Sequence, residues 1–180
     1  MHRLFVALRP PAAVRAALRG IMAGVPHARW QDDDQLHLTL RFIGEVERPQ
    51  AEDIAAALGH VGPESIAIAL NGVGRFDKSG RTDAIWAGVS PHDALHRLHK
   101  KVDRALQAVG LPPEGRAYLP HITIARLPRS AGVEAQVDRY LADHVALTSA
   151  PFAPSHMTLF ESRLGRDGAL YEPIERWPIA

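Results

Sequence analysis

Two short stretches with the same alternation constrain this chain more than any other feature of its 180 residues. In QLHLTLRFIG, which begins at residue 35, apolar residues alternate with His37, Thr39 and Arg41. A period of two is typical of a strand with one buried face. The pattern returns 84 residues further on in PHITIAR, where His121 and Thr123 share a face. We therefore predict two half-buried strands, one per half of the chain, each presenting an imidazole and a hydroxyl.

The His-x-Thr spacing is more frequent than chance allows. Ten histidines and five threonines in 180 residues predict about 0.3 such pairs. Three are present, the third being His156 and Thr158. On a strand, residues i and i+2 project from one face about 6–7 Å apart, so a small anion can contact both side chains. Two facing pairs would supply two imidazoles that titrate near neutral pH, as acid–base phosphoryl chemistry requires. Threonine hydroxyls and arginines would hold the phosphate oxygens.

Composition excludes several classes of protein. With 46% hydrophobic residues and no cysteine, the chain can bury a core without disulfides or thiolate chemistry. Positive and negative charges are balanced in each half, so there is no basic tail of the kind that binds nucleic acid irrespective of sequence. No apolar run approaches the roughly 18 residues of a membrane span, and MHRLFVAL is too short for a signal peptide. We expect a soluble, cytoplasmic protein that does not bind membranes and is a monomer.

Turn residues and periodicity predict an α+β chain whose two halves repeat the order strand, helix, His-x-Thr strand, helix. Helices are expected over residues 12–22, 49–58, 91–109 and 131–142. Other strands are expected over residues 3–8, 65–76, 83–90, 152–161 and 169–178, with a brief strand edge and an acidic turn at 29–34. A fold with a pseudo-twofold axis would bring the two His strands to one central cleft. Without a low-complexity linker, residues 1–180 are expected to form one bilobal domain.

The same residues carry a family resemblance. HLTL at residue 37 and HITI at residue 121 resemble the paired signatures of the 2H phosphoesterases. The more similar branch is the RNA 2′,3′-cyclic phosphodiesterases, long named 2′-5′ RNA ligases. The resemblance runs almost from end to end through RLFVAL, HLTLRFIGEV, Gly72-x-Gly74-x-Phe76, IWAGV, Tyr118-x-Pro120, IAR, LFESRL, Tyr171 and Trp177-Pro178.

This resemblance implies two pseudo-twofold-related lobes of antiparallel sheet and helices around a water-filled cleft. It also implies opening of a terminal 2′,3′-cyclic phosphate to a 2′-phosphate without a metal or other cofactor. By resemblance, His121 accepts a proton from the attacking water and His37 donates one to the departing 3′-oxygen, although the sequence alone permits the reverse. Thr39 and Thr123 would bind phosphate oxygens. The expected partner is RNA with a 2′,3′-cyclic phosphate terminus, or a cyclic nucleotide.

The sequence assigns the roles of two arginines and of the third His-x-Thr pair less directly. Arg126 matches the family's arginine after the second motif and is predicted to contact phosphate. Strict alternation from His121 puts it on the opposite face, however, so a β-bulge must re-aim it or it must reach around from that face. Strict alternation places Arg41 on the same face as His37 and Thr39. The simpler interpretation is that its side chain meets solvent at the end of the strand. His156 is interpreted as an ordinary strand residue, with a substrate contact as the alternative.

Three rival functions remain. A binding module for RNA ends or nucleotides could retain the cleft without turnover, but the intact His and Thr pairs argue against it. His92, His96 and His99 have a helical metal-ligand spacing, although a solvated helix face is the favoured interpretation. The reverse reaction would join RNA ends through a 2′-5′ linkage. Water at roughly 55 M favours hydrolysis unless the ends are held together.

Overall fold

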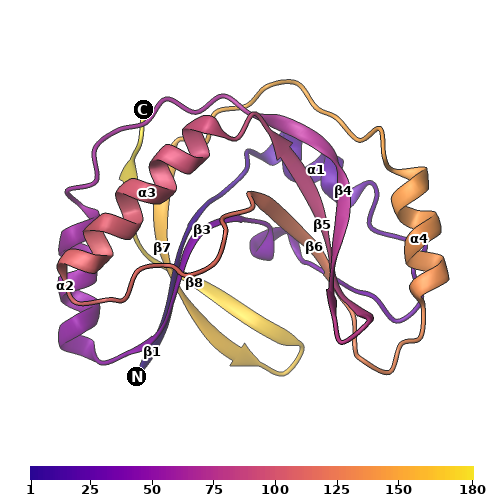
Figure 1. Cartoon of the computed structure of the whole chain (residues 1–180), viewed down its shortest axis with the longest axis horizontal. Helices are drawn as coiled ribbons and strands as arrows, with labels where there is room; N and C mark the ends of the chain where they lie inside the picture. Colours follow the sequence, from indigo (N-terminus) through magenta and orange to yellow (C-terminus); the bar gives the residue numbers. More distant parts are fainter.

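One curved antiparallel sheet forms the frame of the molecule, and the computed structural model describes all of residues 1–180 (Figure 1). Seven strands lie in the order β4-β5-β6-β3-β1-β7-β8, and the short β2 pairs with β6. The bounds are β1 (His2–Leu8), β2 (Arg29–Trp30), β3 (Leu38–Val46), β4 (Ala69–Lys78), β5 (Arg81–Ser90), β6 (His121–Arg126), β7 (His156–Gly165) and β8 (Gly168–Pro178).

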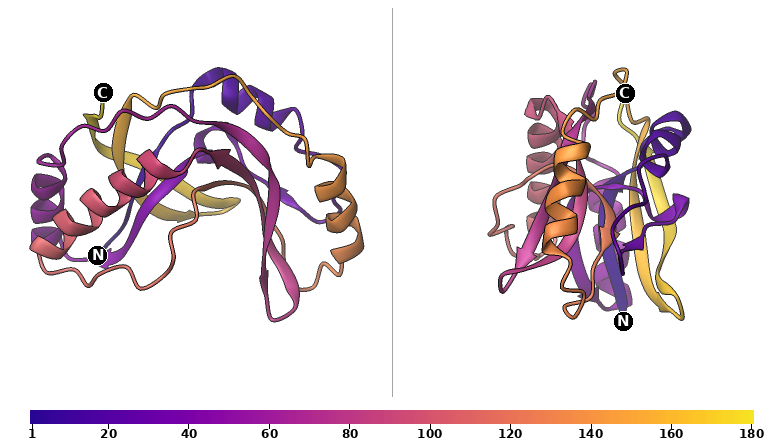
Figure 2. Two further views of the ribbon diagram at one scale, coloured as in Figure 1. Left: turned by 45° about the horizontal axis from the view of Figure 1, so that its top comes forward. Right: turned by 90° about the vertical axis from the view of Figure 1, so that its right-hand side faces the viewer.

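Four α-helices and one short 3₁₀ helix accompany the sheet. They are α1 (Ala12–Arg19), η1 (Asp33–Gln35), α2 (Arg48–Leu58), α3 (Asp93–Ala108) and α4 (Glu134–Asp143). Prolines stand at the starts of α1 and α2, where a missing N–H costs nothing. In α3, leucines and a valine at helical spacing are fully buried. Figures 1 and 2 show α2 and α3 together at one end of the arch and α4 at the other.

The two halves of the chain are related by a pseudo-twofold axis. The order β1, α1, β3, α2 in the first half is repeated as β5, α3, β6, α4 in the second, as the sequence predicted. In the sheet, β3 corresponds to β6, β1 to β5 and β7 to β4. The two halves meet where β3 pairs with β6, and Leu38 and Ile122 are the only residue pair at that junction. The lobes therefore share one continuous sheet.

The main hydrophobic core lies on one face of this sheet. Leu38, Leu40, Ile122 and Ile124 are at most 2% exposed and belong to the largest apolar cluster. Because side chains alternate across a strand, the histidines and threonines between them face the other side. Burial of the apolar positions thus fixes which face of the sheet carries the polar groups.

Three strand boundaries lie four residues later than expected. β4 begins at Ala69, and β7 is shifted at both ends, to His156 and Gly165. Before β7, Pro151 and Pro154 lack the N–H that a ladder needs, and only an isolated bridge joins Phe152 to Ile68. Among the helices, none is long and apolar enough to cross a membrane.

Candidate active site

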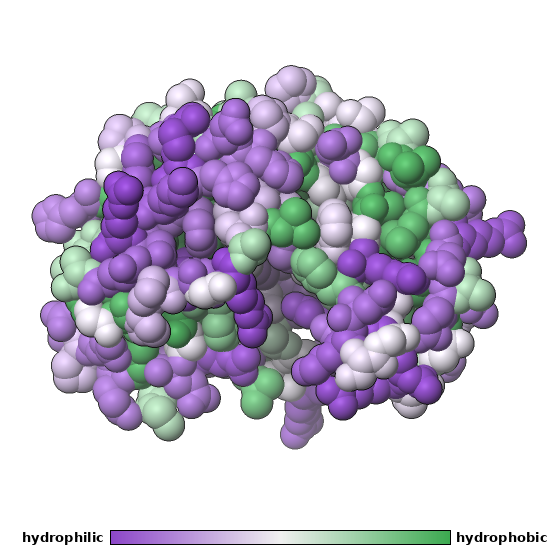
Figure 3. Space-filling view, viewed as in Figure 1, coloured by the Kyte–Doolittle hydropathy of each residue, from purple (hydrophilic) through white to green (hydrophobic).

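The structure brings the two predicted His-x-Thr pairs together on one face of the sheet. Leu38 pairs with Ile122 across the antiparallel junction. Extending this register by one residue on each side places Thr39 opposite His121 and His37 opposite Thr123. The four side chains therefore mark a rectangle of roughly 5 by 7 Å. These four residues are the candidates for catalysis, and we call them the catalytic rectangle. Figure 3 shows a hollow between the two halves of the molecule.

Both histidines are held by the same kind of hydrogen bond. The Nδ1 of His37 lies 2.7 Å from the Gln35 carbonyl oxygen, and the Nδ1 of His121 lies 2.7 Å from the Leu119 carbonyl oxygen. A carbonyl oxygen only accepts, so Nδ1 carries the proton and donates it in each case. Each neutral imidazole consequently keeps the lone pair of its Nε2 for a reaction.

Aromatic rings surround His37. Its ring centroid lies 4.9 Å from that of Phe5 and 5.2 Å from that of Tyr171, which it meets edge-on. Phe160 stacks on Phe5 at 5.2 Å. Burial in this environment lowers the pKa of His37 to about 4, and the nearby positive charge of Arg126 acts in the same direction.

His121 has its own aromatic neighbours on the strands that correspond by pseudo-symmetry. Phe76 of β4 meets its ring edge-on at 4.8 Å, and Trp86 of β5 lies at 6.1 Å. Gly74 makes room for this arrangement, because a Cβ there would stand 2.2 Å from the Trp86 ring. Burial lowers the pKa of His121 as well, and the charge of Arg126 lowers it further.

These pKa directions define what the site can do. Near neutral pH both imidazoles are uncharged, and each Nε2 is a base. An anion bound between them favours the protonated form of an imidazole, so one histidine can gain a proton when a phosphate binds while the other remains a base. The arrangement is suited to general acid–base catalysis on a phosphodiester.

A β-bulge turns Arg126 toward the site. Two consecutive residues of β5 pair with Thr123 and Ala125, which leaves Ile124 as the extra residue. Arg126 therefore faces the same side as Thr123. Its Nη1 lies 3.5 Å from an Asp83 carboxylate oxygen, and its side chain is about half exposed. The structure thus has the bulge that the predicted phosphate contact of Arg126 requires.

A matching bulge turns Arg41 away from the site. Two consecutive residues of β1 pair with Thr39 and Arg41, which leaves Leu40 as the extra residue. Arg41 is 8% exposed. Its Nε donates to Asp103 at 2.9 Å and its Nη1 to Glu114 at 3.0 Å. The expectation that Arg41 shares the catalytic face or meets solvent is therefore wrong, because the bulge reverses the alternation.

The helix histidines make structural contacts. His92 Nε2 bonds the Val89 carbonyl oxygen, and His99 Nδ1 bonds the Leu40 carbonyl oxygen, both at 2.7 Å. His99 also stacks on Tyr118 with a centroid distance of 4.2 Å. No group of three or more His, Cys, Asp or Glu side chains is placed to hold a metal ion.

Sequence reasoning missed most of the aromatic neighbours of the histidines. Phe5, Phe160 and Tyr171 lie on three different strands, β1, β7 and β8. Their proximity to His37 depends on how those strands pair, which a single-sequence pattern does not contain. The only signal was their presence in the segments that carry the family resemblance.

Comparison with known proteins agrees with this geometry. A family model described as the 2′-5′ RNA ligase superfamily matches residues 10–166. An RNA 2′,3′-cyclic phosphodiesterase of Aeropyrum pernix is 33% identical over 162 residues, covering 88% of this chain and 91% of that protein. Another, from Methanocaldococcus jannaschii, is 28% identical over 180 residues, covering 97% and 99%.

Solved structures show the same fold. The crystal structure of Escherichia coli LigT complexed with 3′-AMP matches with a TM-score of 0.78 at 26% identity, covering 99% of this chain and 98% of that one. The crystal structure of a Thermus thermophilus protein gives 0.78 at 25% identity, covering 98% and 97%. The chain therefore belongs to the 2′-5′ RNA ligase superfamily of 2H phosphoesterases.

Proposed function

We propose that this protein hydrolyses 2′,3′-cyclic phosphate ends of RNA to 2′-phosphates by acid–base catalysis between His37 and His121. The observation that carries the proposal is the catalytic rectangle, in which hydrogen bonds leave the Nε2 of each imidazole free for chemistry. The family and the names of the relatives support the same reaction.

The proton transfers follow from the geometry of displacement at phosphorus. The attacking water and the departing oxygen lie roughly in line on opposite sides of the phosphorus atom. The Nε2 of His121 takes a proton from the water as its oxygen bonds to phosphorus. The protonated Nε2 of His37 donates its proton to the 3′-oxygen as the phosphorus–oxygen bond breaks. The phosphate stays on the 2′-oxygen.

Three side chains would hold the non-bridging phosphate oxygens. Thr39 and Thr123 occupy the other two corners of the catalytic rectangle and supply hydroxyl donors. Arg126, which the bulge turns to the same face, adds a charged donor to oxygens that gain negative charge in the transition state. Its contact with Asp83 is long, at 3.5 Å, so little holds the guanidinium away from a bound anion.

The substrate class and setting complete the proposal. The substrate is an RNA with a 2′,3′-cyclic phosphate terminus or a cyclic nucleotide, and no cofactor takes part. A net charge of +1 suits a protein that contacts a few terminal nucleotides rather than a long duplex. We propose a monomer that acts in the cytoplasm, where a chain without cysteine needs no oxidising environment.

The test is turnover of an RNA oligonucleotide ending in 2′,3′-cyclic phosphate, in excess EDTA, by wild type, His37→Ala and His121→Ala. We expect wild type to release a 2′-phosphate and each variant to lose at least about 100-fold in kcat, the scale of general acid–base groups. His60→Ala, at an exposed histidine, is the matched control and should retain activity. A wild-type protein that binds the oligonucleotide but leaves it intact would make the binding module the better model.

A second substrate separates the two roles. Sulfur in place of the 3′-oxygen gives a thiolate leaving group, whose conjugate acid has a pKa of about 8.5 and which departs without protonation. His37→Ala should recover most of its lost rate on this substrate, and His121→Ala should not. The opposite pattern would reverse the acid and base assignment.

A further inference from the structure

A polar groove outside the catalytic rectangle is lined by His156, the histidine of the third His-x-Thr pair. It encloses about 520 Å³ between the start of α1 and strands β7 and β8. We call it the β7–β8 groove. No carboxylate lines it, and its polar lining comprises Arg9, Arg15, Ser155, His156, Thr158 and Arg176.

The groove opens on the sheet face that carries the catalytic rectangle. Ala7 of β1 pairs with Thr39 on one side and with Thr158 on the other. Residues directly opposite one another share a face, so Thr158 points the same way as Thr39. Two strand spacings put these threonines roughly 10 Å apart, with only the methyl group of Ala7 between them. Arg176, opposite Thr158 on β8, extends the same row.

The hydroxyl of Thr158 is available as a hydrogen-bond donor. The residue is 6% exposed and lines the groove, yet its hydroxyl has no hydrogen-bond partner in the protein. The hydroxyl is therefore available at the wall of the groove, and a ligand oxygen there could accept a hydrogen bond from it. Arg176, its neighbour in the row, forms no ion pair and is exposed.

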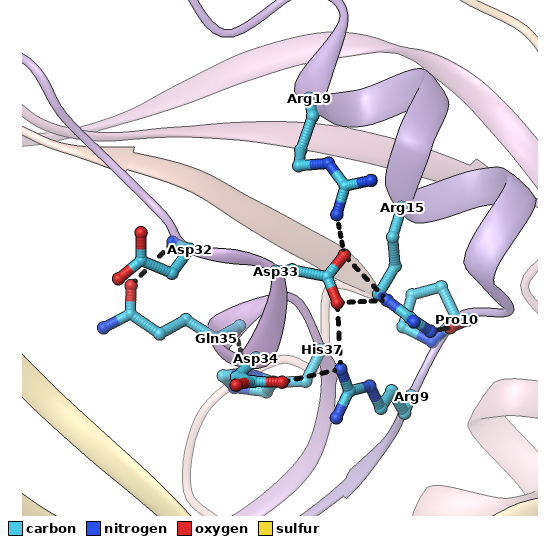
Figure 4. Close-up of polar contacts among 9 residues, drawn as sticks. All are labelled: Arg9, Pro10, Arg15, Arg19, Asp32, Asp33, Asp34, Gln35 and His37. Carbon is cyan, nitrogen blue, oxygen red and sulfur yellow. Dashed lines mark hydrogen bonds and ion pairs between the residues drawn. The ribbon is translucent and has the colours of Figure 1, made fainter.

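The other two arginines of the groove are fixed in place. Asp33 accepts hydrogen bonds from Arg9, Arg15 and Arg19, and Asp34 accepts one more from Arg9 (Figure 4). Arg9 uses only one of its terminal nitrogens in these contacts, and Arg15 leaves its Nη2 unused. A guanidinium has five N–H donors, so both arginines retain donors at fixed positions.

We propose that the β7–β8 groove binds a phosphodiester of the RNA strand upstream of the cyclic end. The proposal rests on the proposed function. If His37 protonates the 3′-oxygen, the ribose lies on the β3 side of the phosphorus, and the strand continues outward over β1 to β7. The next phosphodiester then reaches arginine donors and the Thr158 hydroxyl, which are well suited to its anionic oxygens. The protein thereby distinguishes an RNA end from a free cyclic mononucleotide.

The test compares two substrates, a nucleoside 2′,3′-cyclic phosphate and an oligonucleotide with the same end. Arg176→Ala and Thr158→Val should each raise KM for the oligonucleotide, the first by about fivefold or more, and leave kcat unchanged. KM for the mononucleotide, which has no upstream phosphodiester, should stay the same in both variants. Loss of one phosphate contact should also reduce the slope of log KM against log salt concentration by about 0.7 for a single strand.

Arg104→Ala is the matched control, because Arg104 is an exposed arginine without an ion pair on α3, outside the groove. An unchanged oligonucleotide KM in Arg176→Ala and Thr158→Val, with normal mononucleotide turnover in wild type, would overturn the groove proposal and leave the proposed function standing. If wild type turns over neither substrate, the proposed function fails. Fluorescence anisotropy with a 3′-phosphorylated oligonucleotide then decides the groove: weaker binding by Arg176→Ala supports it, and equal binding overturns it.

Discussion

At the scale of single residues, the two histidines differ in their surroundings and share their hydrogen bonding. Each donates Nδ1–H to the carbonyl oxygen of the residue two positions earlier. His37 is packed against rings from three strands, and its pKa falls to about 4, whereas the pKa of His121 is lowered by burial beside two rings. The protein therefore holds both groups neutral until an anion arrives.

This arrangement predicts an acidic pH optimum for kcat/KM. In the proposed mechanism the reactive form of the pair carries one proton, and kcat/KM reports the protonation of the free protein. Because burial lowers the pKa of His37 and that of His121, the singly protonated pair is most populated below pH 6.5, and kcat/KM should fall as the pH rises above that value. In the complex, the bound anion raises these pKa values, so the alkaline limb of kcat should lie at higher pH. Steady-state kinetics from pH 4 to 9 measure both limbs. Coincident limbs, or a kcat/KM that rises above pH 7, would contradict the prediction.

Arg41 predicts an effect on stability without an effect on chemistry. It is almost fully buried and holds Asp103 and Glu114. Arg41→Ala removes the only cation paired with two partly buried carboxylates, which keep only weaker hydrogen bonds from Gln107 and from backbone N–H groups. The free energy of unfolding should therefore fall by about 3 kcal/mol. Urea denaturation measures the loss, and kcat of the folded variant should stay within about twofold. A variant with wild-type stability and a large loss of kcat would contradict this prediction and indicate that Arg41 acts in the active site.

At the scale of strands and helices, the sequence predicted the order of elements and the polar face of both His strands. Apolar residues at every second position are fixed by burial of one face, so His37, Thr39, His121 and Thr123 could be placed on the other. The orientations of the arginines could not be predicted in the same way. A bulge adds one residue to one strand of a pair, so it shows only in the register between two strands. The same limit hid the aromatic neighbours of His37.

The pairing of β4 with β5 predicts a role for Gly74. A Cβ at this position would stand 2.2 Å from the Trp86 ring, so Gly74→Ala must displace the indole that lies beside His121. We expect a loss of about 1–3 kcal/mol in the free energy of unfolding together with reduced kcat. Gly62→Ala is the control, because no atom lies within 4 Å of its added Cβ. In the double variant Gly74→Ala/Trp86→Leu, the loss in the free energy of unfolding should be smaller than the sum of the losses in the two single variants. Additive losses would show that the contact is not the cause.

At the scale of the whole molecule, the shared sheet predicts cooperative unfolding. The halves meet at the Leu38–Ile122 pair, and one apolar cluster contains residues from both. We propose that residues 1–180 unfold as one unit. Trp86 in β5 and Trp177 in β8 lie in different halves of the sheet. Variants in which one of these two is the only tryptophan, with Trp30 also replaced, report on each half. Their urea midpoints should coincide with that of far-UV circular dichroism. Separate midpoints would indicate two independent lobes.

The shared Nδ1 bonds have a consequence for successive rounds of catalysis. In the proposed mechanism each imidazole exchanges a proton only through its Nε2, so one hydrolysis leaves His121 charged and His37 neutral, the mirror image of the starting state. Microscopic reversibility makes that mirror image the starting state for closing the cyclic phosphate again. Before hydrolysing another end, the protein must return one proton to solvent and collect another. Immediately after hydrolysis the two histidines therefore have the protonation states that closing the cyclic phosphate requires. The rate at which they exchange protons with water then decides how often that reverse reaction can occur.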